Sequence, residues 1–334
     1  MMICSKHASL FIAILFICGC NEGSKQKEEI KQENVAEKSD STDITGDDEL
    51  TYIQAYDKAL KLLETPFEEK EIKTSFGNAH VIVCGPANAE PLILLHGMNA
   101  SSTMWYPNIK SLSKQYRIYA IDFLLEPGKS LCQGDINSTD QIVSRYYEIF
   151  DQLQLKKINL LGASRGGWLA LSIALHSQSR INKIALLSPA QAFTWIKPSS
   201  DVISNVTYSM LPKRKRLRNV LSTMTFNVDK ISQVYINQYY IATKEANTNK
   251  CILQMTPFSG EQLKSLNIPV LVLIGDNDII NNDKSLEKAK KYLPNVETEI
   301  IKNAGHFLSI DQPEIIDKEI LIFLNQSSNV SAKK

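Results

Sequence analysis

The chain has 334 residues, and its 37 lysine and arginine residues against 36 aspartate and glutamate residues give a formal net charge of +1 at pH 7. This balance leaves no global field, which argues against nucleic acid or another polyanion as a partner. The part that follows the first 50 residues is long enough for one large α/β domain.

The N-terminus resembles an export signal. A basic residue, Lys6, precedes an apolar run over residues 8–17, which is too short to span a membrane and is typical of a signal-peptide core. Gly19 stands directly before Cys20, and this pair resembles a bacterial lipobox with Cys20 as the lipidated residue. We therefore expect residues 1–19 to be a signal peptide and the protein to be exported, as a lipoprotein anchored at the cell surface or periplasmic side of a bacterial membrane. The alternative is a plain secretory signal.

Residues 20–50 are charged, rich in acids and nearly free of aromatic side chains. Such a segment buries too little apolar surface to fold, so we expect a disordered tether. The domain beyond it contains Cys84, Cys132 and Cys251, an odd set that cannot all pair internally. Their spacing predicts neither a metal site nor a disulfide framework, while a single disulfide among them stays an open alternative.

Strand and helix patterns alternate along the rest of the chain. A hairpin is expected over residues 70–85, with its turn at Gly77-Asn78. Further strands are expected at residues 91–96, 117–122, 157–162, 183–188, 269–275 and 296–302, and helices at residues 138–153, 167–179 and 313–325. This alternation predicts an α/β fold whose sheet is mainly parallel and doubly wound, with helices on both faces.

The segment from residue 191 to residue 266 is much longer than an ordinary connection. We expect it to form a helical cap that selects the substrate, between core segments 51–190 and 267–328. Phe193 and Trp195 at its start are candidates for contact with substrate. The basic run from Lys213 to Arg218 has two interpretations, contact with an anionic membrane surface or a solvated helix face.

The strongest motif is I-N-L-L-G-A-S-R-G-G-W at residues 158–168. A short apolar run ends at Gly-x-Ser-x-Gly and continues into a helix-forming segment, which is the context of a nucleophile elbow. The strained turn exposes the hydroxyl of Ser164, while Gly162 and Gly166 let strand and helix approach closely. We therefore expect Ser164 to be a nucleophile.

Two later segments supply the partners that a serine nucleophile needs. The apolar run V-L-V-L-I-G ends just before Asp276 and Asp278, and a second strand pattern leads to His306. Both groups follow strand C-termini, where open α/β sheets place their sites. His306 is expected to take and return the proton, and a carboxylate must orient it. Asp276 competes for that role, but the spacing Gly-x-x-Asp favours Asp278.

A third segment, P-L-I-L-L-H-G-M-N at residues 91–99, predicts a strand that ends in a sharp turn beside the elbow. The amides of Met98 and Arg165 can then form an oxyanion hole, with two donors aimed at the charge of a tetrahedral intermediate. His96 is expected to support the turn and to take no part in catalysis. Asn99 and Trp105, which follow the turn, are candidates for contact with substrate.

These motifs together resemble those of the Ser-His-Asp α/β-hydrolases, of the bacterial carboxylesterase and C–C hydrolase type. The resemblance covers roughly residues 52–325 and includes the segments Y-I-Q-A-Y-D-K-A-L, G-N-A-H-V-I and M-W-Y-P-N-I. It implies an α/β-hydrolase fold with a helical cap inserted after the sixth strand.

The chain departs from the family pattern at two places. Most relatives have a glycine-rich loop after the strand at residues 117–122, but here the loop reads D-F-L-L-E-P-G-K-S and keeps only Asp122, Gly128 and Ser130 of the pattern. Arg165 is unusual directly after the nucleophile. Its side chain either binds an anionic group in the acyl pocket, as an arginine is thought to do in some dehalogenases, or folds against an acidic residue of a neighbouring loop.

We expect a serine hydrolase that cleaves a small-molecule carboxylic ester through an acyl-enzyme, with no metal and no organic cofactor. Two alternatives stay open. The same triad supports a C–C bond hydrolase, a lactonase or a perhydrolase, and the same scaffold supports a cell-surface binding protein without turnover. The complete triad weighs against the binding protein.

Overall fold

The computed structural model describes residues 50–245 and 255–326. The predicted signal peptide, the tether up to residue 49, Cys20 and Cys251 lie outside the described residues. In the two described ranges, no helix combines the length and the apolar character that a membrane crossing requires.

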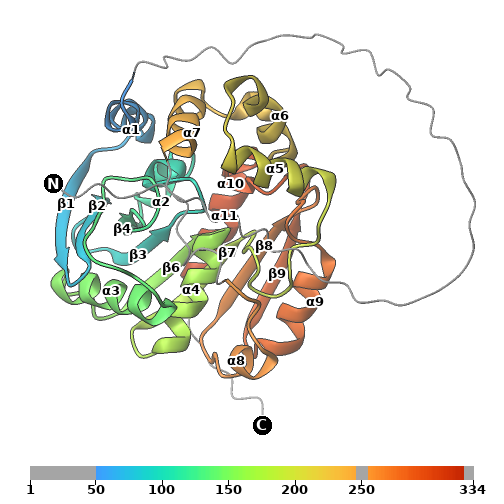
Figure 1. Cartoon of the computed structure of the whole chain (residues 1–334). Coiled ribbons are helices and arrows are strands. Elements are labelled where there is room, and N and C mark those ends of the chain that lie inside the picture. The colour runs from blue at the N-terminus through green and yellow to red at the C-terminus, as the bar shows by residue number, and fades with distance from the viewer. Residues whose placement is uncertain (1–49, 246–254, 327–334) are drawn as a thin grey trace, which may run out of the picture. The chain divides into compact units, whose positions relative to one another are not determined.

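A mostly parallel sheet runs through the domain (Figure 1). Its strands are β1 Phe67–Thr74, β2 Gly77–Cys84, β3 Glu90–Leu95, β4 Tyr116–Ile121, β5 Leu131–Cys132, β6 Ile158–Ala163, β7 Ile181–Leu187, β8 Val270–Gly275 and β9 Val296–Ile301. The order is β1-β2-β4-β3-β6-β7-β8-β9, with β5 paired to β2. Strands β3, β4 and β6 to β9 are parallel to one another, while β2 pairs antiparallel with β1, β4 and β5. The predicted fold class is confirmed.

Helices cover both faces of this sheet (Figure 1). They are α1 Tyr52–Leu60, α2 Ile109–Leu112, α3 Thr139–Gln152, α4 Arg165–His176, α5 Ser200–Met210, α6 Arg214–Met224, α7 Gln233–Glu245, α8 Gly260–Lys264, α9 Asp283–Tyr292, α10 Leu308–Asp311 and α11 Pro313–Asn325. Local sequence sets several of their starts. Ser138 and Gln141 form a capping box at α3, and Pro313 occupies the first turn of α11.

The two faces of the sheet carry separate hydrophobic clusters because successive side chains of a strand point to opposite sides. On β3, Leu92 and Leu94 pack in a cluster with α1, α2 and α11, while Ile93 and Leu95 pack in a cluster with α3, α4 and α9. Both sets are buried, which explains why this strand reads as a continuous apolar run.

The predicted hairpin forms, but its turn lies two residues earlier in the sequence than predicted. Thr74 pairs with Gly77, so the turn is Ser75-Phe76 and Gly77 begins β2. Gly77 is needed for another reason, since a Cβ at this position would lie 2.0 Å from the carbonyl oxygen of Leu131 on β5. Cys84 is buried and Cys132 is exposed, and both are free.

Helices α5, α6 and α7 lie together beyond one end of the sheet (Figure 1). They fall within the range of the predicted cap, and α7 packs against α1. The cap was predicted to extend to residue 266, and within that range α8 packs against α9 beside the core. Leu263 of α8 and the following Leu266 are buried in the same cluster as Val270 of β8. The domain boundaries themselves stay a prediction.

Candidate active site

Ser164 stands at the turn between β6 and α4 with φ 53° and ψ −118°, a strained backbone for a residue with a Cβ. Close packing of strand and helix forces this turn. A Cβ on Gly162 would lie 2.3 Å from the carbonyl oxygen of Gly166, and a Cβ on Gly166 would lie 2.0 Å from that of Leu95. The arrangement has the geometry expected of a nucleophile elbow.

The structure brings the three predicted catalytic side chains together. His306 Nε2 lies 2.9 Å from Ser164 Oγ, and His306 Nδ1 lies 3.0 Å from Asp278 Oδ1. Ser164 follows β6, while Asp278 follows β8 and His306 follows β9, so the sheet aligns three strand ends at one edge. His306 is therefore positioned to accept the proton of Ser164 while Asp278 holds its ring.

Asp276, the competing carboxylate, points elsewhere. Its Oδ1 accepts hydrogen bonds from Ala304 N at 3.2 Å and from Asn277 Nδ2 at 2.7 Å. The Asp278 side chain is buried, and it also accepts hydrogen bonds from the amides of the turn, Ile280 N at 2.8 Å and Asn281 N at 3.2 Å. Burial raises the pKa of Asp278, but the charge of His306 and these hydrogen bonds outweigh it and hold the pKa below its ordinary value. Asp278 is therefore the carboxylate suited to stabilise an imidazolium.

The predicted oxyanion turn, Gly97-Met98-Asn99, lies against the nucleophile. A Cβ built on Gly97 would be 3.4 Å from Ser164 Cβ and 4.0 Å from Ser164 Oγ, so the residue directly before Met98 packs against the nucleophile. Within the described ranges, the amides of Met98 and Arg165 donate to no other group of the chain. Both remain available as donors to a bound oxyanion.

His96 links this turn to the loop after β4 by hydrogen bonds. Its Nε2 accepts the Phe123 amide at 2.8 Å, so the proton is on Nδ1, which donates to the Gly97 carbonyl oxygen at 2.8 Å. Burial, together with the positive charge of Arg165, lowers the pKa of His96 to about 4. The ring is neutral at pH 7 and acts as a fixed hydrogen-bond bridge between two loops.

Of the two interpretations of the Arg165 side chain, contact with an anionic acyl group finds no support in the structure. Its guanidinium is buried, lies 3.7 Å from the centroid of the Phe123 ring and has Nε 3.4 Å from Glu126 Oε1. The alternative interpretation, an arginine folded against an acid of a neighbouring loop, is the one observed. Glu126 was missed, although its loop was recognised as a departure from the family pattern.

The other predicted substrate contacts divide into two groups. Trp105 and Phe193 are fully buried in the two core clusters, so their predicted contact with substrate finds no support. Asn99 lies at the oxyanion turn, where its side-chain amide donates to Ser209 Oγ of the cap at 3.2 Å. Trp195 is 62% exposed between β7 and α5, and its role stays a prediction.

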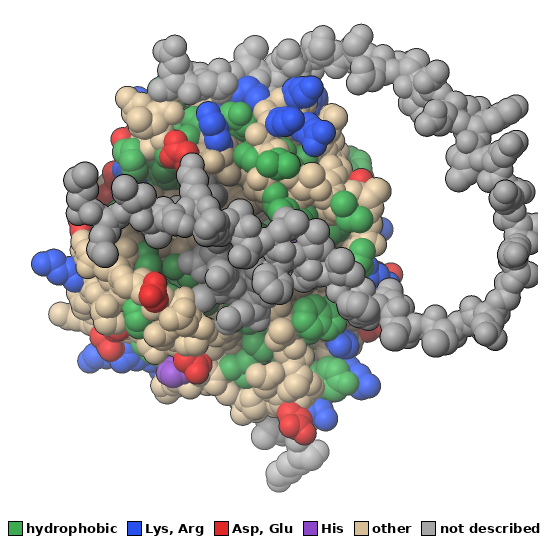
Figure 2. All heavy atoms as spheres, in the orientation of Figure 1, with side chains coloured by type: hydrophobic (Ala, Val, Ile, Leu, Met, Phe, Trp, Pro, Cys, Tyr) green, Lys and Arg blue, Asp and Glu red, His purple; other side chains and the backbone are tan. Residues whose placement is uncertain are grey.

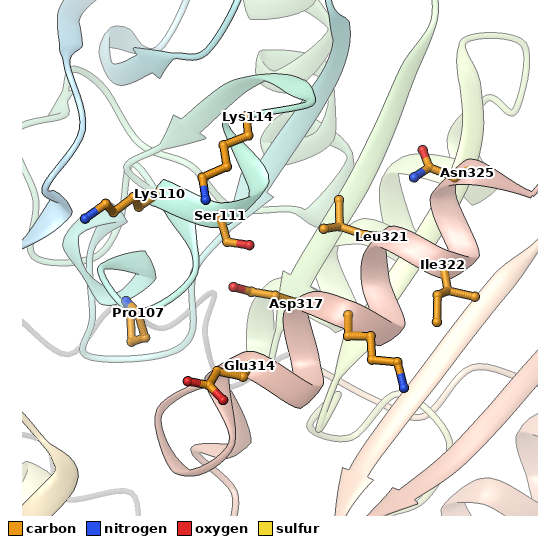
Figure 3. Close-up of a pocket in the computed structure, with 10 residues that line it drawn as sticks. Pro107, Lys110, Ser111, Lys114, Glu314, Asp317, Leu321, Ile322 and Asn325 are labelled. Carbon is orange, nitrogen blue, oxygen red and sulfur yellow. The ribbon is translucent and has the colours of Figure 1, made fainter.

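A groove of about 720 Å³ lies between α2 and α11 (Figure 3) and contains none of the triad residues. Asp317 on α11 faces α2 in this groove and accepts a hydrogen bond from Asn108 Nδ2 at 2.8 Å. Burial raises the pKa of Asp317 to about 6, although hydrogen bonds from Asn108 and Ser111 oppose the rise. Lysines, carboxylates and apolar side chains line this groove, and we assign it no part in the chemistry.

Comparison with known proteins agrees with this geometry. The family model described as serine aminopeptidase, S33, matches residues 87–313. A carboxylesterase of Bacillus subtilis, nap, which is described as uncharacterized, is 31% identical over 301 residues, or 88% of this chain and 98% of that protein. Carboxylesterase YbfK of the same organism is 32% identical over 82% of this chain and 94% of its own length. The crystal structure of naproxen esterase from B. subtilis matches with a TM-score of 0.78 at 30% identity, covering 84% of this chain and 99% of that chain.

The fold and these matches define the class, which is an α/β hydrolase with a mainly parallel sheet. Within that class the chain belongs to the serine aminopeptidase S33 family, and it is a carboxylesterase-like serine hydrolase.

Proposed function

We propose that this enzyme hydrolyses small carboxylic esters through an acyl-enzyme formed on Ser164. The observation that carries the proposal is the continuous chain of contacts from Ser164 Oγ through His306 to Asp278, with distances of 2.9 and 3.0 Å. Names of relatives support the ester as substrate, since they are carboxylesterases and a naproxen esterase. The particular acid and alcohol are left to measurement.

The chemistry follows from the positions of these groups. Ser164 Oγ attacks the ester carbonyl carbon as His306 Nε2 takes the hydroxyl proton, and Asp278 stabilises the imidazolium that forms. The Met98 and Arg165 amides bind the oxyanion of the tetrahedral intermediate. Collapse of this intermediate breaks the bond to the alcohol, which leaves with the proton from His306. Water then attacks the acyl-enzyme by the same route and releases the carboxylic acid.

Replacement of the nucleophile tests this function directly. We expect Ser164→Ala to lose all but about a millionth of kcat on p-nitrophenyl butyrate, because members of a triad act as a unit. Ser172→Ala is a matched control from the same helix, because Ser172 Oγ donates to the Trp168 carbonyl oxygen at 3.1 Å and contacts none of the triad. Wild-type hydrolysis by the Ser164→Ala enzyme would contradict the proposal.

We further propose that the enzyme is an exported lipoprotein anchored through Cys20. The short apolar run before Cys20 supports this, and the cap offers a surface suited to an anionic membrane. Exposed apolar side chains of α5 and the residue after it are Ile203, Val206, Met210 and Leu211. The neighbouring exposed basic residues are Lys213, Lys215 and Arg216. Figure 2 shows Lys and Arg side chains over α6 beside hydrophobic side chains over α5. Stable membrane anchoring takes two signals, and a basic patch can act together with a lipid anchor.

Fractionation of a bacterium that expresses the full chain tests the anchor. We expect the wild type in the membrane fraction with a lipid-modified Cys20 in its N-terminal peptide, and Cys20→Ser either unprocessed or released. Cys18→Ser serves as the control, since Cys18 lies in the same segment but lacks a small residue before it. A wild-type protein with an unmodified N-terminus beyond Cys20 would contradict the anchor without affecting the proposed hydrolysis.

A further inference from the structure

The two departures from the family pattern bring two side chains into contact, those of Glu126 and Arg165. Glu126 comes from the loop after β4, and Arg165 comes directly after the nucleophile, yet Arg165 Nε lies 3.4 Å from Glu126 Oε1. The side chain of Glu126 is only 2% exposed and that of Arg165 only 4%. A buried ion pair is expensive to desolvate, so its presence under the catalytic turn needs a reason beyond stability.

The Glu126 carboxylate also touches the oxyanion turn. Its Oε2 accepts a hydrogen bond from the backbone amide of Asn99 at 3.0 Å. The backbone of Asn99 is left-handed, with φ 55°. The peptide that joins Met98 to Asn99 is therefore fixed on its N–H side by Glu126.

The preceding peptide is fixed on its carbonyl side. Gly97 O accepts from His96 Nδ1 at 2.8 Å and from Arg165 Nη2 at 3.4 Å. In a trans peptide the C=O and N–H bonds point in opposite directions, so holding Gly97 O toward His96 and Arg165 turns the Met98 N–H the other way. These contacts leave that amide free beside Ser164.

We propose that Glu126 is a positioning residue for the oxyanion hole: its carboxylate, held in place by Arg165, fixes the Asn99 amide and thereby aims the Met98 amide at the oxyanion. Arg165 thus contributes twice, through its own backbone amide and through its guanidinium. The proposal rests on the proposed ester hydrolysis and adds to it a residue outside the triad.

The pair has few other partners, which makes the effect of each change distinct. The contact between Arg165 Nε and Glu126 Oε1 lacks hydrogen-bond geometry, and neither atom has another hydrogen-bond partner in the described chain. Loss of one partner therefore leaves the other charge buried without compensation, whereas loss of both removes the charges together. We therefore expect the free energy of unfolding to depend on whether both charges are present or both absent. We expect kcat to depend on whether an acceptor for the backbone amide of Asn99 is present.

Two double variants separate these effects. The first combines Glu126→Gln with Arg165→Met and keeps a side-chain carbonyl as acceptor for Asn99. The second combines Glu126→Met with Arg165→Met and removes that acceptor, while neither variant retains a buried charge. With p-nitrophenyl butyrate we expect kcat to be roughly tenfold to a hundredfold lower in the second double variant than in the first, because small misplacements of catalytic groups have effects of this size. KM should differ by less than about threefold, since the oxyanion forms only after substrate has bound.

A milder single variant covers the case in which the second double variant fails to fold. Glu126→Asp keeps the charge but is one methylene too short to reach both Asn99 and Arg165, so kcat should fall roughly tenfold or more with KM little changed. Asp151→Asn is the control, because it removes an ion pair to Arg180 at the surface, where Arg180 Nη1 lies 2.5 Å from Asp151 Oδ1.

Equal kcat in the two double variants, or wild-type kcat in Glu126→Asp, would overturn the positioning role. A wild-type enzyme that fails to hydrolyse esters would instead overturn the proposed function, so the two failures are distinguishable.

Discussion

Two buried carboxylates flank the nucleophile, and they differ in how well they are hydrogen-bonded. Asp278, in the turn after β8, accepts from His306, Ile280 and Asn281. Glu126, in the loop after β4, accepts one backbone amide, that of Asn99, and faces Arg165 without a hydrogen bond. Burial raises the pKa of both groups, but only around Asp278 do the histidine and the hydrogen bonds outweigh burial; the pKa of Glu126 stays raised.

The difference indicates that the charged and hydrogen-bonding partners of a buried carboxylate, more than burial itself, set its ionisation here. Asp278 is held ionised, which suits a group that must stabilise an imidazolium in the transition state. Glu126 is held by one cation and serves to fix a turn. The first should therefore matter chiefly for the rate, and the second for both rate and stability.

Among the buried carboxylates, the largest effect is expected where Asp278 is replaced by its uncharged amide. Asp278→Asn should lower kcat about ten-thousandfold, because an amide neither selects the productive tautomer of His306 nor stabilises its charged form. Asp276→Asn is the matched control from the same turn and should have a much smaller effect, since Asp276 bonds to Ala304 and Asn277. Steady-state kinetics with one p-nitrophenyl ester rank the two variants, and the reverse order would assign the acid to Asp276.

Replacement of Arg165 by methionine tests Glu126, the carboxylate with fewer hydrogen bonds, because it removes the cation that faces it. The change leaves the charge of Glu126 buried and unpaired, so the melting temperature should fall by roughly 10 °C, as expected for loss of one partner of a buried pair. Because the guanidinium does not reach a substrate, kcat/KM for a hemisuccinate-type ester and for a butyrate ester should fall by the same factor. A selective loss on the hemisuccinate would restore the anion-binding interpretation.

A third buried carboxylate extends the comparison with a smaller effect. Asp317 has a raised pKa of about 6 against an ordinary value of 3.8, so the protonated form is favoured in the folded state. Its favourable contribution is complete below the unfolded pKa and is lost as the pH rises through the folded pKa. Asp317→Asn should therefore raise stability at pH 8 by on the order of 2 kcal/mol, with no gain near pH 3.5. Denaturant titrations at the two pH values measure this, and equal effects at both would contradict it.

The sequence was sufficient for the parts of the site that local pattern determines. Apolar runs and glycines located the strand ends that carry Ser164, Asp278 and His306, and the spacing chose the carboxylate that contacts His306. Side chains that meet only through tertiary packing were less accessible. Arg165 and Glu126 are 39 positions apart in the sequence, and no periodicity relates them.

The same distinction holds for the fold. The strands at 91–96 and 269–275 were predicted within one residue, because both are buried on two faces. The hairpin turn was misplaced because Gly77 was interpreted as a turn residue, whereas contact with β5 requires a glycine there. Trp105 and Phe193 illustrate a similar limit, since an aromatic residue that packs in a core has the same local sequence as one that lines a pocket.

Covalent labelling with a fluorophosphonate probe tests the central claim, that His306 activates Ser164, without knowledge of the natural substrate. Peptide mass spectrometry of the labelled enzyme should find one adduct, on the peptide that contains Ser164, and labelling should nearly cease in His306→Ala while Ser172→Ala is labelled as the wild type. An adduct on a different serine, or no adduct in an enzyme that still hydrolyses esters, would contradict the account.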